Sequence, residues 1–300
     1  NASDAARLKQ AVGLKMYMGS STGSLLVDDF AGQYSHFSTY LRQRPVAVHA
    51  ENEPAIEWFA RQGQRRPPLC AVLDTARALV MAESLGRHVH ICHLSTAHEL
   101  RLVQAAKARG VAVTCEVAPH HLFMTEEAEW RLGPLAKMNP PLRPASDRAA
   151  LWRHLDVIDA VASDHAPHTL AEKRVGVAKA PAGVPGLETT LPLLLTAASE
   201  GQLMLADVVR LASMGPARIF GLAKKGRLAP GYDADLVLVD PEARWTIQDA
   251  KLFTKCGWSP FAGWRIKGRV EQVYLRGRLV YAEGEVLAEP GSGRLVPVRT

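Results

Sequence analysis

The stretch Ile158-Asp159-Ala160-Val161-Ala162-Ser163-Asp164-His165-Ala166-Pro167-His168 places one acid and two imidazoles directly after a short apolar run. A short apolar run that ends at polar residues is typical of a buried β-strand. Asp164, His165 and His168 therefore lie where this strand is expected to emerge into a loop. In barrels of parallel strands the loops after the strands converge at one edge, and functional side chains gather there.

Four apolar runs upstream also carry polar side chains at or near their ends. They are Val12–Met18, which contains Lys15; Val46–Glu51, which ends in His49-Ala50-Glu51; His88–Ser95, which contains Cys92-His93; and Val111–Val117, which contains Glu116. A barrel brings strand ends together whatever their separation in sequence. We therefore treat Lys15, His49, His93 and Asp164 as one cluster.

Helical patterns alternate with these strands, and this alternation predicts parallel βαβ units. The expected helices are 69–87, 97–109, 147–154, 187–201 and 205–213, and Asp147 is expected to be the N-cap of the third. The fold class is thus α/β, a (β/α)8 barrel of the TIM type. Only five barrel strands can be counted where closure needs eight. We expect these to be strands 4–8 of a barrel whose first part is missing from this chain.

The pattern changes after Phe220. Two segments, 226–240 and 270–281, read as strands punctuated by glycine and aspartate, without helical patterns between them. We predict an incomplete barrel over residues 1–220 and a small β-rich domain over residues 221–300.

Composition limits the class of partner. The 300 residues are 47% hydrophobic, enough for a large core, and the net charge is +6. Lysine and arginine are scattered without a basic stripe, so we expect no nucleic acid partner, although a positive field favours a small anionic substrate. No apolar run is long enough to cross a membrane, and we expect no membrane association. The 4 cysteines fit a reducing cytoplasm.

The strand-end cluster has the chemistry of a metal site. Neutral imidazoles and carboxylates bind divalent metals such as zinc, and a lysine inside a barrel mouth is costly as an unpaired cation. Taken singly, His49, His93 and Asp164 also fit polar core or cap residues, and Lys15 fits a salt-bridged lysine. Their joint placement at strand ends favours a metal site.

Longer motifs surround these residues and give the chain a family resemblance. They are Gly13-Leu14-Lys15, His49-Ala50-Glu51, His90-Ile91-Cys92-His93, Thr114–Leu122, Lys137–Arg143, Ser163–His168 and Pro185–Thr189. In this order, and over nearly the whole chain, they resemble the dihydroorotases of the cyclic amidohydrolase family.

The resemblance implies a set of metal ligands. Lys15, as N6-carboxylysine, together with His49, His93 and Asp164 would hold two zinc ions that activate a hydroxide. Asp164 would also be the catalytic acid and base. Animal-type members place a cysteine and a glutamate at a third zinc, and Cys92 and Glu116 match those positions; from the residues alone, Cys92 fits a packed apolar side chain equally well.

The resemblance also implies how substrate is held. Asn139 and His168 match positions that hold the substrate carboxylate and ring, with help from backbone groups at Ala166 and at Pro185-Gly186. The family's His-x-His pair on the first strand, and the substrate arginine after it, have no counterpart here. His88-Val89-His90 has that spacing but lies on the expected sixth strand and matches no ligand pair.

The implied reaction is the reversible conversion of L-dihydroorotate and N-carbamoyl-L-aspartate in pyrimidine synthesis. The implied partners are a second copy, as a homodimer, and aspartate transcarbamoylase. The segment Gly19–Ser24 resembles a mobile loop that closes over substrate, although an ordinary surface turn fits its composition equally well. Two alternatives stay open: another cyclic amidase such as an allantoinase or dihydropyrimidinase, and a non-catalytic scaffold of aspartate transcarbamoylase.

Overall fold

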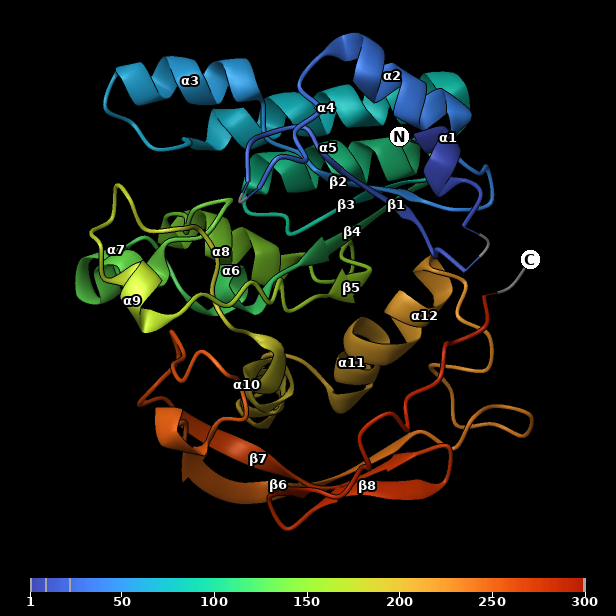
Figure 1. Ribbon diagram of the computed structural model, residues 1–300, viewed down its shortest axis with the longest axis vertical. Coiled ribbons are helices and arrows are strands. Elements are labelled where there is room, and N and C mark those ends of the chain that lie inside the picture. The colour runs from blue at the N-terminus through green and yellow to red at the C-terminus, as the bar shows by residue number, and fades with distance from the viewer. Residues whose placement is uncertain (1, 9, 22, 299–300) are drawn as a thin grey trace. The chain divides into compact units, whose positions relative to one another are not determined.

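The computed structural model describes residues 2–8, 10–21 and 23–298 (Figure 1). Backbone contacts divide the chain into two compact units, residues 1–187 and 188–300. The domain boundary that the sequence suggests at residue 220 stays a prediction, because these contacts group the helices between 188 and 220 with the second unit.

The first unit is built on a five-stranded sheet in which every neighbouring pair is parallel, in the order β1-β2-β3-β4-β5. The strands are β1 (Leu14–Tyr17), β2 (Val46–His49), β3 (Val89–Ile91), β4 (Val113–Val117) and β5 (Ala160–Val161). Spatial order follows chain order, as in an arc of a (β/α)8 barrel. The five predicted strands and their parallel, barrel-like arrangement are confirmed.

Burial along the strands separates the two faces of the sheet. All four residues of β2 are buried, as expected for a parallel strand covered on both sides. In β4, Val113, Cys115 and Val117 are buried while Thr114 and Glu116 are only half-buried. In-register neighbours share a face, so the pairings of Lys15 with Ala47, Ala47 with His90 and His90 with Thr114 put these polar side chains on one face.

Helices follow the strands of the first unit, and α4 and α5 lie along the sheet in Figure 1. The helices are α1 (Ala2–Ala5), α2 (Phe30–Thr39), α3 (Glu53–Arg61), α4 (Pro68–Leu85), α5 (Ala97–Ala108), α6 (Pro119–Phe123), α7 (Glu127–Leu132), the 3-10 turn η1 (Gly133–Ala136), α8 (Ala145–Arg153) and α9 (Leu170–Lys173). Within the described part of the chain, none of the helices has both the length and the apolar content to cross a membrane.

The expected role of Asp147 as an N-cap is wrong. Helix α8 begins after Pro144, so Asp147 lies in its first turn. Its carboxylate instead accepts a hydrogen bond from the backbone N–H of Ala97, 2.8 Å away, at the start of α5. A carboxylate is favourable at the amino end of either helix, and tertiary packing directs this one to the neighbouring helix.

The second unit holds an antiparallel sheet in the order β6-β7-β8-β9, which confirms the small β-rich part. Its elements are α10 (Leu187–Ser199), α11 (Leu205–Val209), the π-helical turn η2 (Arg210–Met214), α12 (Gly215–Ile219), β6 (Leu236–Thr246), the 3-10 turn η3 (Asp249–Lys251), β7 (Arg265–Leu275), β8 (Arg278–Ala282) and β9 (Glu285–Val286). Strands β7 and β8 are joined by Arg276-Gly277, both with positive φ, as a tight hairpin requires.

Candidate active site

Two of the predicted metal ligands have a backbone conformation that is rare for residues other than glycine. His93 follows β3 with a φ of 37°, and Asp164 follows β5 with a φ of 43°. Residues other than glycine rarely adopt positive φ, and the cost is retained chiefly where function or dense packing demands it. The chain therefore bends sharply after both strands, at two of the positions where the sequence predicts metal ligands.

The His49 and His93 rings meet edge to face in a buried position. Nδ1 of His49 lies 3.0 Å from Nε2 of His93. Two imidazole nitrogens bound to one tetrahedral zinc lie about 3.3 Å apart, so this pair fits ligation of a single ion. Burial, reinforced by His49 and Lys15, lowers the pKa of His93 well below its usual value. The ring is therefore neutral at pH 7, as a metal ligand must be.

Glu51, for which the sequence motifs indicated no role, contacts His49 on the side away from His93. Its carboxylate is fully buried, with Oε2 3.2 Å from Nε2 of His49 and 2.5 Å from Nη1 of Arg66. Nη2 of Arg143 lies 4.0 Å from Oε1. Burial alone would raise the pKa of Glu51, but His49 and the two guanidinium groups lower it to about 2.

A carboxylate behind a histidine fixes the ring and its tautomer when the other nitrogen binds a metal. The Glu51–His49 contact, with Nδ1 of His49 aimed at His93, has this arrangement. The motif His49-Ala50-Glu51 held a signal for it, because residues two apart at a strand end point to the same side.

Lys15, Cys92, Glu116 and Asp164 lie within electrostatic reach of one another. Burial disfavours the Lys15 ammonium, but Cys92, which is hydrogen-bonded to it, and Glu116 more than offset this and raise the pKa of Lys15. Burial raises the pKa of the Cys92 thiol to about 12. Burial also raises the pKa of Asp164, while Lys15 and His49 act in the opposite direction. The structure thus gathers the predicted ligands, and their coordination of metal stays a prediction.

A second group of donor atoms surrounds Cys92. One ligand atom from each of His90, Cys92 and Glu116 lies within 4.8 Å of the others. Nε2 of His90 is 3.0 Å from Oε2 of Glu116, and its Nδ1 is 2.9 Å from Oγ1 of Thr114. Sulfur, nitrogen and oxygen ligands together suit zinc. The sequence motifs assigned Cys92 and Glu116 to this site and left out His90.

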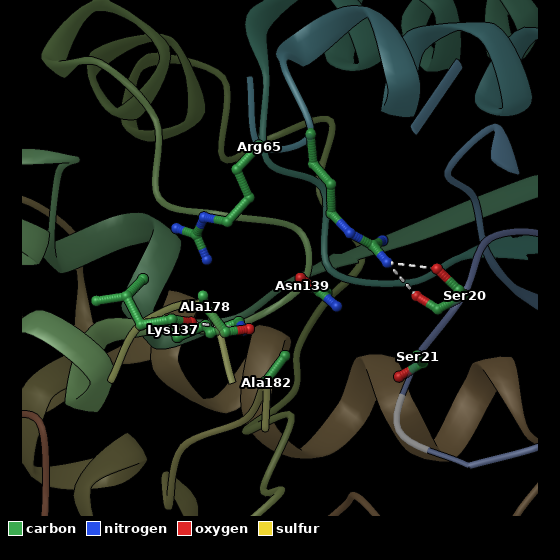
Figure 2. A pocket seen from close by; sticks show the side chains of 9 residues that line it. Ser20, Ser21, Arg65, Lys137, Asn139, Ala178 and Ala182 are labelled. Atoms are coloured by element: carbon green, nitrogen blue, oxygen red, sulfur yellow. Dashed lines mark hydrogen bonds between the residues drawn. The ribbon is translucent and has the colours of Figure 1, made fainter. Parts of the chain in front are cut away.

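A cavity of about 360 Å³ opens beside Asn139. Figure 2 shows the side chains that line it. Three basic side chains line it, Arg65, Arg66 and Lys137, and the sequence analysis assigned none of them to the site. The adjacent arginines were a visible but weak signal, because exposed pairs of basic residues are common. The cavity can hold a small anion.

The segment expected as a mobile loop forms one wall of the cavity. Ser20 and Ser21 line it, and Nη2 of Arg66 donates a hydrogen bond to Oγ of Ser20 over 2.8 Å. The backbone N–H of Ser20 also donates to Glu53, 2.5 Å away. Thr22, in the same segment, lies outside the described residues.

The remaining predicted substrate residues follow β5. Nε2 of His168 lies 3.2 Å from the carbonyl oxygen of Ala182, and the N–H of Ala166 donates to the carbonyl of Val184 over 3.0 Å. Gly186, next to Pro185, donates its N–H to Nδ1 of His165 over 3.2 Å. Segment 181–186 therefore packs against the loop that carries Asp164.

Comparison with known proteins matches residues 41–280 to the amidohydrolase family. A dihydroorotase of Pyrococcus furiosus is 39% identical over 94% of this chain and 64% of that protein. The multifunctional protein CAD of Squalus acanthias is 41% identical over 95% of this chain and 11% of that protein. The chain thus spans slightly less than two thirds of the length of the dihydroorotase.

Solved structures give the same fold. The L-hydantoinase (dihydropyrimidinase) of Arthrobacter aurescens has a TM-score of 0.92 and 31% identity, and the alignment covers 99% of this chain and 69% of that one. A D-hydantoinase has a TM-score of 0.91 and 29% identity, with 100% and 72% covered.

Proposed function

Because this chain belongs to the amidohydrolase family, we propose that it is the larger part of a dihydroorotase. The reaction is the reversible hydrolysis of L-dihydroorotate to N-carbamoyl-L-aspartate, a step of pyrimidine synthesis. The observation that carries this choice among cyclic amidases is the charge of the cavity beside Asn139.

Dihydroorotate bears a carboxylate, whereas the rings of dihydropyrimidines, hydantoin and allantoin bear none. Arg65, Arg66 and Lys137 give the cavity a positive field around Asn139. A positive field in a recessed site raises the local concentration of an anion and stabilises it when bound. A neutral ring would gain nothing from this field, because it carries no charge for the field to attract. Arg65 and Arg66 keep their protein partners, Glu129 and Glu51, in either case.

We propose that Lys15, His49, His93 and Asp164 hold a pair of zinc ions, with Lys15 as N6-carboxylysine. His90, Cys92 and Glu116 would hold a third. Two observations support a metal site. Nδ1 of His93 is buried without a hydrogen-bond partner, and Nδ1 of His49 and Nε2 of His93 point toward each other. Bound there, the metal pair would activate water and polarise the amide carbonyl.

The chain's own side chains would divide the remaining work. Asp164 would accept a proton from the attacking water and return it to the ring nitrogen that leaves, and burial favours its protonated form as an intermediate stage. Asn139 and His168 would hold the substrate carboxylate and ring. Backbone groups of Ala166, Pro185 and Gly186 would contact the ring.

The test is hydrolysis by the full-length protein in ultraviolet assays, with zinc present. L-Dihydroorotate should be cleaved with a kcat/KM about 1,000-fold above that for dihydrouracil or allantoin, because only dihydroorotate carries a negative charge that the positive field of the cavity attracts. An Asp164→Ala control should be inactive. Preference for a neutral ring would instead support a dihydropyrimidinase, which the structural likeness to the Arthrobacter enzyme favours.

We also propose a cytoplasmic homodimer that associates with aspartate transcarbamoylase. All four cysteines are free thiols, which fits a reducing compartment. A related segment occurs inside a much longer multifunctional protein, which supports association with other enzymes. Full-length protein that lacks bound zinc and activity, yet binds aspartate transcarbamoylase, would instead support a non-catalytic scaffold.

A further inference from the structure

Lys173 is a lysine that the proposed chemistry does not use, and its side chain is fully buried. Its ammonium donates three hydrogen bonds to backbone carbonyls: to Pro181 over 2.9 Å, to Gly183 over 3.0 Å and to Lys137 over 3.0 Å. A lysine ammonium has three donors, so these bonds use all of them. A buried charge is costly unless it is fully hydrogen-bonded. We therefore ask what these three hydrogen bonds hold in place.

The three carbonyls belong to the two segments that carry the predicted substrate residues. Pro181 and Gly183 flank Ala182, and the carbonyl of Ala182 faces Nε2 of His168 at 3.2 Å. This contact is a hydrogen bond when Nε2 carries the proton, which fixes the tautomer of His168. The first two bonds of Lys173 therefore hold the carbonyl that orients His168.

The third bond of Lys173 reaches residues 137–139, here called the Asn139 segment. Lys137 lies two residues before Asn139, and its carbonyl accepts from both the Lys173 ammonium and the N–H of Gly183, the latter over 2.9 Å. Nζ of Lys137 also donates to the carbonyls of Val177 and Ala178, over 2.7 and 3.1 Å. Residues 174–183, here called the strap, are thus tied to the Asn139 segment.

The strap lies close against the loop after β5. Gly183 has a φ of 133°, and a Cβ at this position would lie 2.5 Å from the carbonyl oxygen of Ala166 and 3.3 Å from Nε2 of His168. Little movement of the strap toward this loop is possible. Any displacement caused by a weakened clamp is therefore outward, away from His168.

We propose that Lys173 is a positioning residue, which clamps the strap to the Asn139 segment so that His168 and Asn139 together face the substrate carboxylate. The assignment of a carboxylate substrate rests on the proposed function. The clamp itself does not, because it follows from the contacts of Lys173 alone.

The clamp is sensitive to pH. Burial, with the neighbouring cations Lys137 and Arg65, lowers the pKa of Lys173 to about 8, while Glu172 and Arg174 beside it in sequence are exposed. A neutral amine has two donors where the ammonium has three. One of the three clamp bonds is therefore lost as the pH rises through about 8.

The test compares Lys173→Met with Lys179→Met in the full-length zinc-loaded protein, because Lys179 lies on the same strap with an exposed side chain. Hydrogen–deuterium exchange followed by mass spectrometry should show amides of 174–183 exchanging about tenfold faster in Lys173→Met. Lys179→Met should match the parent. Thermal unfolding checks that both variants fold. Equal strap exchange in the two variants would overturn the clamp.

Kinetics then separate the clamp from a merely structural role. In Lys173→Met, KM for dihydroorotate should rise about tenfold while kcat changes less than about threefold. In the parent, KM should rise between pH 7 and pH 9, and Lys173→Arg, which keeps its charge, should lose this rise. A flat KM profile in the parent would overturn the positioning role. Absence of dihydroorotase activity in the parent would reject the proposed function, and strap exchange would still decide the clamp.

Discussion

Replacing Glu51 by glutamine tests whether this buried carboxylate stabilises the fold and orients the predicted metal ligand His49. Glu51 is fully buried, 2.5 Å from Arg66, 3.2 Å from His49 and 4.0 Å from Arg143. Both arginines are themselves buried. Glutamine keeps the shape of the side chain and removes its negative charge. The guanidinium groups of Arg66 and Arg143 would then stay buried without that charge beside them.

The magnitude follows from two independent arguments. Breaking one partner of a buried ion pair costs about 3–5 kcal/mol. A carboxyl whose pKa falls from 4.5 to about 2 on folding contributes about 3 kcal/mol at pH 7, at about 1.4 kcal/mol per pH unit. We therefore expect Glu51→Gln to lower the free energy of unfolding by about 3 kcal/mol.

The pH dependence has a definite sign. Because the folded-state pKa of Glu51 is depressed, its stabilisation is fully present above pH 4.5 and is lost as the pH falls from 4.5 toward about 2. The difference in unfolding free energy between the parent and Glu51→Gln should thus be constant from pH 7 to pH 5. It should narrow below pH 4.5.

The assay is thermal unfolding of the chelator-treated protein by circular dichroism, where a loss of this size lowers the midpoint by about 6–12 °C. The matched control is Glu57→Gln, since Glu57 is exposed and its pair with Arg61 is on the surface of α3; it should cost less than about 0.5 kcal/mol. Zinc titration should show about 10–100-fold weaker binding in Glu51→Gln, because His49 loses its orienting partner. Equal midpoints for the two variants would refute the reasoning.

Three further outcomes follow from the site. Arg65→Ala should raise KM for dihydroorotate about tenfold and leave dihydrouracil turnover unchanged, because Arg65 lines the cavity. Arg61→Ala, at an exposed arginine, is the control. Equal effects of Arg65→Ala on both substrates would contradict an anion-binding cavity. Asp164→Asn should lower kcat about 1,000-fold while folding is preserved by circular dichroism, and near-parent activity would remove Asp164 from proton transfer. Gly183→Ala should destabilise the protein by about 1–3 kcal/mol in thermal unfolding. Gly176→Ala should cost less, because Gly176 also has a positive φ but a Cβ there would have no atom within 4 Å. The reverse order would contradict the close packing of the strap.

Local pattern was enough to find the strands and the side chains at their ends. The apolar runs around Lys15, His49, His93, Glu116 and Asp164 each became a strand of one parallel sheet. Periodicity and burial are short-range signals, and parallel pairing in chain order follows from strand–helix alternation. The sequence therefore indicated which residues share the mouth of the barrel before any distance was known.

What the tertiary structure alone decided is the partner of each buried charge. Asp147 lies in the first turn of its own helix, yet its carboxylate meets the start of α5. Lys173 uses its three donors on carbonyls 8, 10 and 36 residues away. No repeat in the sequence marks such contacts.

The physical reason is that a buried charge is stabilised by whichever groups the fold brings within about 3 Å, and not by its neighbours in sequence. Glu51 shows both sides of this division. Its place two residues after His49 was legible in the sequence. Its ion pair with Arg66 and its approach to Arg143 were set only when the fold brought these two arginines to the end of β2.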